Sequence, residues 1–373
     1  MVDPRMRVDH VGSLLRPPFL RDLMLSDEAS AAEIAAAQDE AIRDVIDRQQ
    51  RLGLPIVTDG EFRRRNFQDS FGEVAGAEHL WRHRKGSVLA PEAVAAPGSR
   101  APDAVSHSVA AKAPVTQRLE LRRNRPLSEF RFSQSVASVP VKVTMISVDR
   151  IRERIDFAGS RDVYGSDDEL MDAVVAVSRE IVGGLVEAGC RYIQIDGPNY
   201  TRFVDPDSLD RIVAEGDDPM DALERAIAWD NAVIEGFDDV VFALHICRGN
   251  RRSMWHRSGS YDPIAERLFT GLAHQRLLLE YDSPRAGTFD PLRFVPAGKT
   301  AVLGLITTKV GQLEDRDTIL RRIEEASRHL PLDQLALSPQ CGFGSDVQGN
   351  QLGIDEQWRK LELVMSIAGE TWG

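Results

Sequence analysis

The sequence predicts a single (β/α)₈ barrel domain that spans residues 1–373. Three observations favour this class: short apolar runs alternate with longer amphipathic segments, about eight such runs occur, and several end on a residue able to bind a metal. A chain of 373 residues with 42% hydrophobic residues can bury a core of this size. No internal repeat marks the units, so the prediction rests on the order of the elements.

The expected strands are short and mostly apolar, which is typical of parallel strands covered on both faces. They are residues 8–12, 55–59, 139–147, 192–196, 240–247, 277–280, 301–306 and 334–338. The first has the shortest apolar run, and an extended arm is the alternative there.

Between these runs, apolar residues recur at helical spacing, which predicts amphipathic helices. The clearest helices are residues 30–52, 167–188, 219–236, 315–329 and 355–367. They are expected to form the outer ring of the barrel.

The segment 81–132 interrupts this alternation and is expected to be a loop and hairpin inserted between the second and third strands. Residues 85–114 are rich in Ala, Pro, Gly and Ser and have no periodicity, which predicts a long mobile loop. Residues 115–132 are predicted to form a hairpin over the barrel rim. The arginines at 122, 123 and 125 are either a solvated face or part of a lid that meets an anionic substrate.

The charge balance narrows the possible partners. A net charge of -12 argues against a general affinity for nucleic acid or anionic lipid, because both require a basic surface. The amino terminus lacks the apolar core of a signal peptide, and no run approaches the roughly 20 apolar residues that span a bilayer. We therefore expect a cytoplasmic protein that acts on a small molecule, and the sequence leaves its oligomeric state open, a homo-oligomer included.

Four residues form a candidate metal site. His245 and Cys247 lie two apart on an expected strand, so both side chains point to the same face. Glu280 ends an apolar strand, where a buried carboxylate needs a cation or hydrogen bonds. Cys341 follows the last strand in a glycine-rich loop. Because all three segments end at the same face of a barrel, the residues would meet there as N, O and S ligands suited to zinc.

Each of these residues also has a structural interpretation. A lone buried His or Cys is more often a packing residue than a ligand. For Cys190, which follows Gly189 at a helix-to-strand turn, we keep this interpretation and expect a core position. For the set of four, metal binding is favoured because it alone accounts for the burial of Glu280.

The chain resembles the catalytic domain of cobalamin-independent methionine synthase, in particular its short, single-barrel relatives. The matching motifs run nearly end to end: His10-Val11-Gly12-Ser13, Arg16-Pro17, Thr58-Asp59-Gly60-Glu61-Phe62-Arg63, Gln194-Ile195-Asp196, His245-Ile246-Cys247-Arg248-Gly249-Asn250, Leu279-Glu280 and Pro339-Gln340-Cys341-Gly342.

This resemblance implies a (β/α)₈ barrel whose zinc is held by the four residues named above, and zinc-dependent methyl transfer to homocysteine. It implies that the loop of His10 and Ser13 takes the substrate carboxylate, while Glu61 and Asp196 take its ammonium group. Zinc would keep the substrate sulfur nucleophilic as a thiolate, and Glu280 would be the ligand that yields its place. The structural alternatives are an exposed loop residue for Glu61 and a turn former for Asp196.

Departures from the family pattern concern the methyl donor. The tryptophan expected to stack on folate falls near Met145, where no aromatic residue is present. The acidic residue expected after Asp196 is Gly197, and the histidine expected as proton donor falls near Lys309, which becomes a second catalytic candidate beside Glu280. The predicted donor is therefore something other than folate polyglutamate, such as a methylated corrinoid protein.

Other functions remain open from the sequence. Short relatives include epoxyalkane:coenzyme M transferase, so addition of a thiol to an epoxide is the second enzyme class. Glu61 and Asp196 favour an amino-acid thiol, whereas a set of cations would favour an anionic thiol without an amine: Arg63, Arg64, Arg248 and Lys309. A non-catalytic zinc-binding protein and the metal-free uroporphyrinogen decarboxylase fold are further alternatives.

Overall fold

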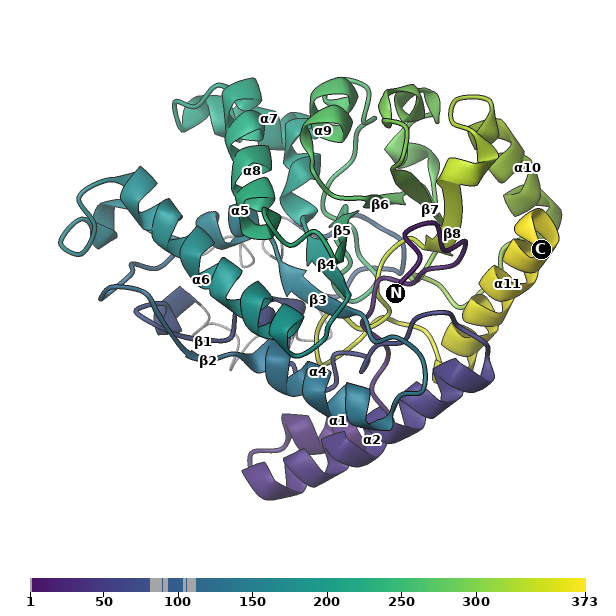
Figure 1. Ribbon diagram of the computed structural model, residues 1–373, viewed down its shortest axis with the longest axis horizontal. Helices are drawn as coiled ribbons and strands as arrows, with labels where there is room; N and C mark the ends of the chain where they lie inside the picture. The colour runs from purple at the N-terminus through teal and green to yellow at the C-terminus, as the bar shows by residue number, and fades with distance from the viewer. Residues whose placement is uncertain (1, 81–88, 90–92, 103–104, 106–111) are drawn as a thin grey trace.

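A computed structural model describes the chain except for residues 1, 81–88, 90–92, 103–104 and 106–111. Six parallel strands pair in the order in which they occur along the chain (Figure 1). They are β3 (Val143–Ile146), β4 (Tyr192–Asp196), β5 (Val241–Ile246), β6 (Arg276–Glu280), β7 (Thr300–Ile306) and β8 (Leu335–Pro339). The predicted strands therefore agree with the structure to within a few residues.

The two remaining strand positions are held by single backbone bridges. Val8 pairs in parallel with Leu337 of β8, and Val57 pairs in parallel with Val141, just before β3. The Thr58 hydroxyl donates to the carbonyl of Gly12 over 2.7 Å and links the two segments. The fold is therefore a (β/α)₈ barrel in which the first two strands are reduced to short contacts.

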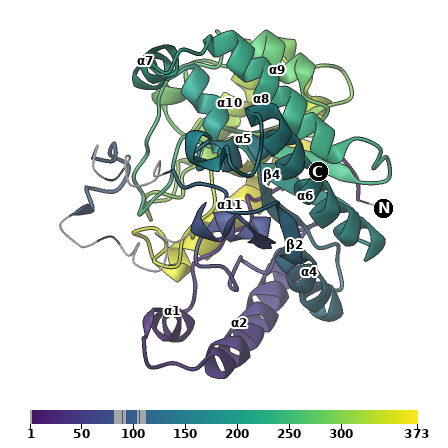
Figure 2. The same ribbon diagram turned by 90° about the vertical axis from the view of Figure 1, so that its left-hand side faces the viewer.

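Helices cover the outside of the strands, as the sequence predicts (Figure 1). They are α1 (Pro18–Leu25), α2 (Ala31–Arg51), α4 (Arg125–Val136), α5 (Val148–Arg152), α6 (Asp167–Glu187), α7 (Pro206–Ala214), α8 (Pro219–Ile234), α9 (Ala265–Gly271), α10 (Arg316–Ser327) and α11 (Ile354–Trp372). Helices α1 and α2 pack together at one edge of the molecule (Figure 2). Within the described residues, no helix is long and apolar enough to cross a membrane.

Four of the five predicted helices carry a capping side chain at the amino end as well as an apolar stripe. Ser30 accepts a hydrogen bond from the Glu33 amide at the start of α2, and Ser166 does the same for α6. Asp218 and Asp315 cap α8 and α10. Each side chain satisfies an amide that the first helical turn leaves without a partner.

The predicted hairpin over residues 115–132 is wrong. Residues Glu120–Arg123 form β2, which pairs with β1 (Glu73–Ala75), and the chain then enters α4. Asn124 caps this helix by accepting from the Leu127 amide, and Pro126 lies in its first turn, where proline is tolerated. Half of the expected loop over 85–114 lies outside the described residues.

The run of arginines beside β2 belongs to a solvated face. Arg122 pairs with Glu120, while Arg123 and Arg125 reach Glu73; the side chains of Arg122 and Arg123 are largely exposed, and that of Arg125 is half-buried. This outcome agrees with the solvated-face interpretation of the run.

The strand register divides the core into an outer and an inner layer. Outward residues such as Ile193 and Ile195 join the large cluster between strands and helices. The inner apolar cluster includes Tyr192, Ala243 and Leu278. Side chains alternate between the two faces of a strand, so the residues two or four positions after these inner residues also point inward. They lie at the carboxyl-terminal mouth of the barrel.

Candidate active site

Two cysteine sulfurs and one imidazole lie close together in the barrel. The imidazole and one sulfur come from the carboxyl-terminal end of β5, and the other sulfur comes from the loop after β8. The candidate ligand atoms of His245, Cys247 and Cys341 all lie within 4.8 Å of one another, and the two sulfur atoms are 3.4 Å apart. All three side chains are buried. The structure thus brings together three of the four residues that the sequence predicts as metal ligands.

Glycines allow the Cys341 loop to approach the first loop of the barrel. A Cβ atom on Gly342 would lie 1.9 Å from the Ser13 hydroxyl oxygen, and one on Gly344 would lie 2.4 Å from the Leu14 carbonyl oxygen. The Phe343 amide also donates to the Ser13 carbonyl over 2.9 Å. Larger residues at these two glycines would push Cys341 away from the other donors.

The donors perturb each other's protonation. The hydrogen bond from Cys341 holds the pKa of Cys247 well below its usual range, and the same contact raises the pKa of Cys341. Burial opposes a charged imidazole, but Cys247, Asp196 and Glu280 together raise the pKa of His245. The cluster therefore favours a thiolate at Cys247, which is the form that binds a metal.

The fourth predicted ligand, Glu280, is fully buried but lies outside the group of three. Its Oε2 accepts from the Arg248 amide over 2.8 Å, and its Oε1 accepts from the Arg285 guanidinium over 2.6 Å. Sequence reasoning missed Arg285, although a cation five residues after a buried glutamate is a usable signal.

The donor set fits a zinc ion. The ring nitrogens of His245 hydrogen-bond to no nitrogen or oxygen in the described part of the chain. A buried imidazole without such partners has a lone pair to offer, and two cysteine sulfurs lie beside it. One imidazole and two thiolates, with a carboxylate nearby, are typical zinc ligands.

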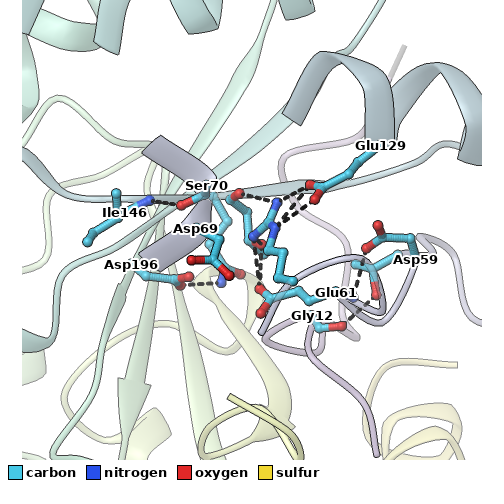
Figure 3. A network of polar contacts seen from close by, with 12 residues as sticks. Gly12, Asp59, Glu61, Asp69, Ser70, Glu129, Ile146 and Asp196 are labelled. Carbon is cyan, nitrogen blue, oxygen red and sulfur yellow. Dashed lines mark hydrogen bonds and ion pairs between the residues drawn. The ribbon is translucent and has the colours of Figure 1, made fainter. Parts of the chain in front are cut away.

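Asp196 lies beside the cluster because β4 and β5 are neighbours, and its partner across the two strands is His245. Its Oδ1 accepts from the Gln194 amide nitrogen over 2.8 Å. Burial and the charge of Glu61 raise the pKa of Asp196 to about 7, although His245 opposes this shift. Figure 3 shows the contacts that hold the two carboxylates.

Glu61 is held by Thr144 of β3 and by Arg64 from its own loop (Figure 3). Its Oε1 accepts from the Thr144 hydroxyl over 2.6 Å and lies 3.3 Å from Arg64. Arg64 in turn makes a buried ion pair with Glu129 at 2.6 Å. Glu61 has a positive φ of 61°, which a non-glycine residue adopts only when its surroundings impose it. Its side chain is therefore firmly positioned inside the barrel and is not an exposed loop residue.

A buried network below Gln194 was not predicted. The ammonium of Lys142 donates to the Gln194 side-chain oxygen and to Asp9 Oδ1, both over 2.8 Å. Arg276 lies 3.1 Å from the other oxygen of Asp9. Burial would raise the pKa of Asp9, but the two cations hold it well below its usual range. Because an ammonium can only donate, it turns the Gln194 oxygen toward itself and the amide nitrogen toward Asp196.

The remaining predicted residues of the site are distributed around the mouth. His10 is buried, and burial lowers its pKa to about 3, so the ring is neutral. The Lys309 ammonium donates to the Gly249 carbonyl over 2.9 Å and to Asn250 Oδ1 over 3.0 Å. Its charge also favours the thiolate form of Cys247. Lys309 is thus close enough to influence the cluster.

The arginines considered for an anionic thiol have other partners. Arg63 pairs with Asp39 and lies over the Phe132 ring at 4.6 Å. Arg64 pairs with Glu129, as described above. The Arg248 guanidinium lies over the Tyr261 ring at 4.5 Å, and only its backbone amide reaches Glu280.

The fold and the site define a barrel with a cysteine–histidine cluster beside paired carboxylates. The family described as "Cobalamin-independent synthase, Catalytic domain" matches residues 17–356. The chain therefore belongs to the cobalamin-independent methionine synthase family, as the sequence motifs indicate.

Individual relatives agree with this assignment. The uncharacterized protein YxjH of Bacillus subtilis is 35% identical over 376 residues, covering 98% of this chain and 94% of that protein. A crystal structure of the putative vitamin-B12 independent methionine synthase of Listeria monocytogenes has a TM-score of 0.71 and 27% identity, and it covers 99% of this chain and 98% of that one. The 5-methyltetrahydropteroyltriglutamate–homocysteine methyltransferase of Acidiphilium cryptum is 25% identical over 333 residues, covering 83% of this chain but 36% of that protein.

Proposed function

We propose that the protein is a zinc-dependent methyltransferase that acts on the thiol of homocysteine and forms methionine. One observation carries the proposal: three metal-type donors lie next to a buried pair of carboxylates inside the mouth of the barrel. Donors for a soft metal suit a thiol, and paired carboxylates suit an ammonium group. Homocysteine carries both groups, and the family membership supports the same substrate.

The metal would be held by His245, Cys247 and Cys341, with Glu280 as the fourth ligand. Bound there, zinc would lower the pKa of a substrate thiol and keep its sulfur nucleophilic at neutral pH. The buried walls of the site would exclude water from this sulfur.

The protein's own residues would orient the amino acid. Asp196 and Glu61 would bind the ammonium, and their fixed partners Gln194 and Thr144 would keep the carboxylate oxygens aimed at it. The loop of Ser13, packed against the Cys341 loop, would receive the substrate carboxylate at the opposite end. Holding both ends would leave the thiol facing the metal donors.

We further propose a methyl donor other than folate polyglutamate, such as a methylated corrinoid protein. The end of β3, where the family pattern has a tryptophan, carries Met145 and Ile146, both buried. The chain also spans 36% of the Acidiphilium methyltransferase, whose printed name specifies a triglutamate donor. Lys309, near the cysteines, would supply a fixed positive charge beside the reacting sulfur.

Addition of a thiol to an epoxide is less well supported. Of the four cations that would favour an amine-free, anionic thiol, Arg63 and Arg64 pair with carboxylates. The Arg248 guanidinium lies over Tyr261 and Lys309 donates to neutral oxygens, so such a thiol would depend on these two cations alone. The two carboxylates of the site would also repel a sulfonate.

The proposal can be tested by incubating the zinc-loaded protein with homocysteine, coenzyme M or glutathione. Each thiol is combined with methylcobalamin, a methyl-folate monoglutamate or triglutamate, or an epoxide, and products are identified by mass spectrometry. We expect methionine from homocysteine and methylcobalamin. A thioether formed from coenzyme M and the epoxide, without methionine from any donor, would contradict the proposed function.

A further inference from the structure

Glu280 is held by two contacts that use both of its carboxylate oxygens. The Arg248 amide is part of the backbone and cannot leave without moving the chain. The contact with Arg285 is made by a side chain, over 2.6 Å. The Arg285 bond is therefore the one that can be exchanged for a metal ion.

Arg285 is itself fixed in place. It follows β6 in the short turn η6 (Pro284–Ala286). Its Nη2 also lies 2.6 Å from Asp282 Oδ1, and its guanidinium lies 5.7 Å from the centre of the Trp255 ring. Its side chain is 13% exposed. Two contacts from two loops thus keep one cation beside Glu280.

We propose that Arg285 is a positioning residue that competes with the metal for Glu280. In one arrangement Glu280 Oε1 is bonded to Arg285, and in the other it completes the metal site. This inference rests on the proposed function, because it assumes that the His245, Cys247 and Cys341 cluster binds zinc and that a thiol takes the fourth position.

Other cations near the site form no ion pair with Glu280. The Lys309 ammonium is bonded to Gly249 and Asn250, and the Arg248 guanidinium lies over the Tyr261 ring, with its nitrogens unpaired in the described residues. In the described part of the chain, Arg285 alone forms an ion pair with Glu280. Removing Arg285 should therefore leave Glu280 without a competing charge partner.

The competition has two consequences of opposite sign. Binding of zinc through Glu280 must break the bond to Arg285, so Arg285 weakens zinc binding. Binding of a thiol releases Glu280, which then regains Arg285, so Arg285 strengthens thiol binding. A residue with only a structural role would weaken both when it is removed.

The test compares Arg285→Met with the wild-type protein in two equilibria. Zinc affinity is measured by competition with a chromophoric chelator, and homocysteine affinity of the zinc-loaded protein by calorimetry. We expect zinc to bind about tenfold more tightly and homocysteine about tenfold more weakly, the size of one charge-assisted hydrogen bond. In a Glu280→Gln background, the Arg285→Met substitution should change neither affinity.

Two controls separate the possible failures. Arg267→Met removes an exposed arginine that pairs with Glu224, and it should leave both affinities unchanged. If Arg285→Met binds zinc as the wild type does, or more weakly, the competition is wrong. If zinc remains after substitution of Cys247 and Cys341, the metal site itself is wrong, whatever Arg285 does.

Discussion

The two sides of the mouth present their polar groups in opposite ways. On the side of β5 and β8, the nitrogens of His245 have no nitrogen or oxygen partner in the described chain. The two cysteine sulfurs contact each other, and that of Cys247 also accepts from the Gly249 amide. On the side of β4, Asp196 and Glu61 are held by donors that are themselves fixed. The first arrangement leaves donors free for a metal, whereas the second preorients acceptors for a substrate.

This contrast predicts that metal content and substrate affinity can be changed separately. The largest effect is expected for the cysteines. We expect the wild type to bind roughly one zinc per chain, and Cys247→Ala and Cys341→Ala should each lose most of it, because thiolates contribute most of the affinity of such a site. Metal analysis after gel filtration measures the loss.

Cys190→Ala is the matched control for this prediction. Cys190 is buried, its sulfur contacts the Tyr192 carbonyl oxygen at 3.4 Å, and burial raises its pKa to about 12. Its removal should leave the zinc content unchanged. If Cys247→Ala and Cys341→Ala both keep their full zinc content, the metal binds elsewhere in the protein.

The next effect concerns Asp196. Asp196→Asn should raise the Kd for homocysteine strongly while zinc content stays normal, because removal of one partner from a buried charged pair costs roughly 2–5 kcal/mol. Coenzyme M has no ammonium, so its binding should change little or improve. Calorimetric titration with both thiols makes the comparison. If the affinity for homocysteine is unchanged, Asp196 does not bind the ammonium group.

A smaller effect is expected for the support of Glu61. Thr144→Val keeps the shape of the side chain but removes the hydroxyl that donates to Glu61 Oε1. The Kd for homocysteine should rise about tenfold, as for loss of one hydrogen bond to a charged group, while zinc content and coenzyme M binding stay constant. An equal loss for both thiols would show that Thr144 only stabilises the barrel.

The contrast also explains how much of the site the sequence could predict. The sequence could bring His245, Cys247 and Cys341 together, with Glu280 outside the group of three, because each lies at or just after the end of a strand and barrel topology places strand ends together. Alternation along β4 likewise placed Asp196 in the mouth. These predictions need only the position of a residue within its own element.

What the sequence could not predict are contacts between side chains from distant elements. Arg64 meets Glu129 across 65 positions, and Arg276 meets Asp9 across 267. No local pattern pairs such residues, since many other charges could have been partners. The hairpin expected at 115–132 failed for a related reason: β2 pairs with Glu73–Ala75, outside the segment considered.

Asp59 sharpens the comparison because, like Glu61, it has a buried carboxylate oxygen without a partner in the described residues. Its Oδ1 accepts from the Glu61 amide over 2.8 Å, but its buried Oδ2 has no partner in the described residues. Burial and then the charge of Glu129 raise its pKa from 3.8 to about 6. The folded protein therefore holds this proton more tightly than the unfolded chain, and the Asp59 carboxyl lowers stability as the pH rises from about 4 to about 6.

The Asp59→Asn variant should lack this dependence, because asparagine keeps the acceptor at Oδ1 but does not ionise. The free energy of unfolding of Asp59→Asn minus that of the wild type should increase by on the order of 1–2 kcal/mol between pH 4.5 and pH 7.5. Urea unfolding at four pH values across this range measures the difference in free energy. A destabilisation by the new amide that is the same at every pH does not affect how this difference changes with pH. If the difference between the two free energies of unfolding stays flat or falls with pH, the Asp59 carboxylate has a stabilising partner in the folded protein.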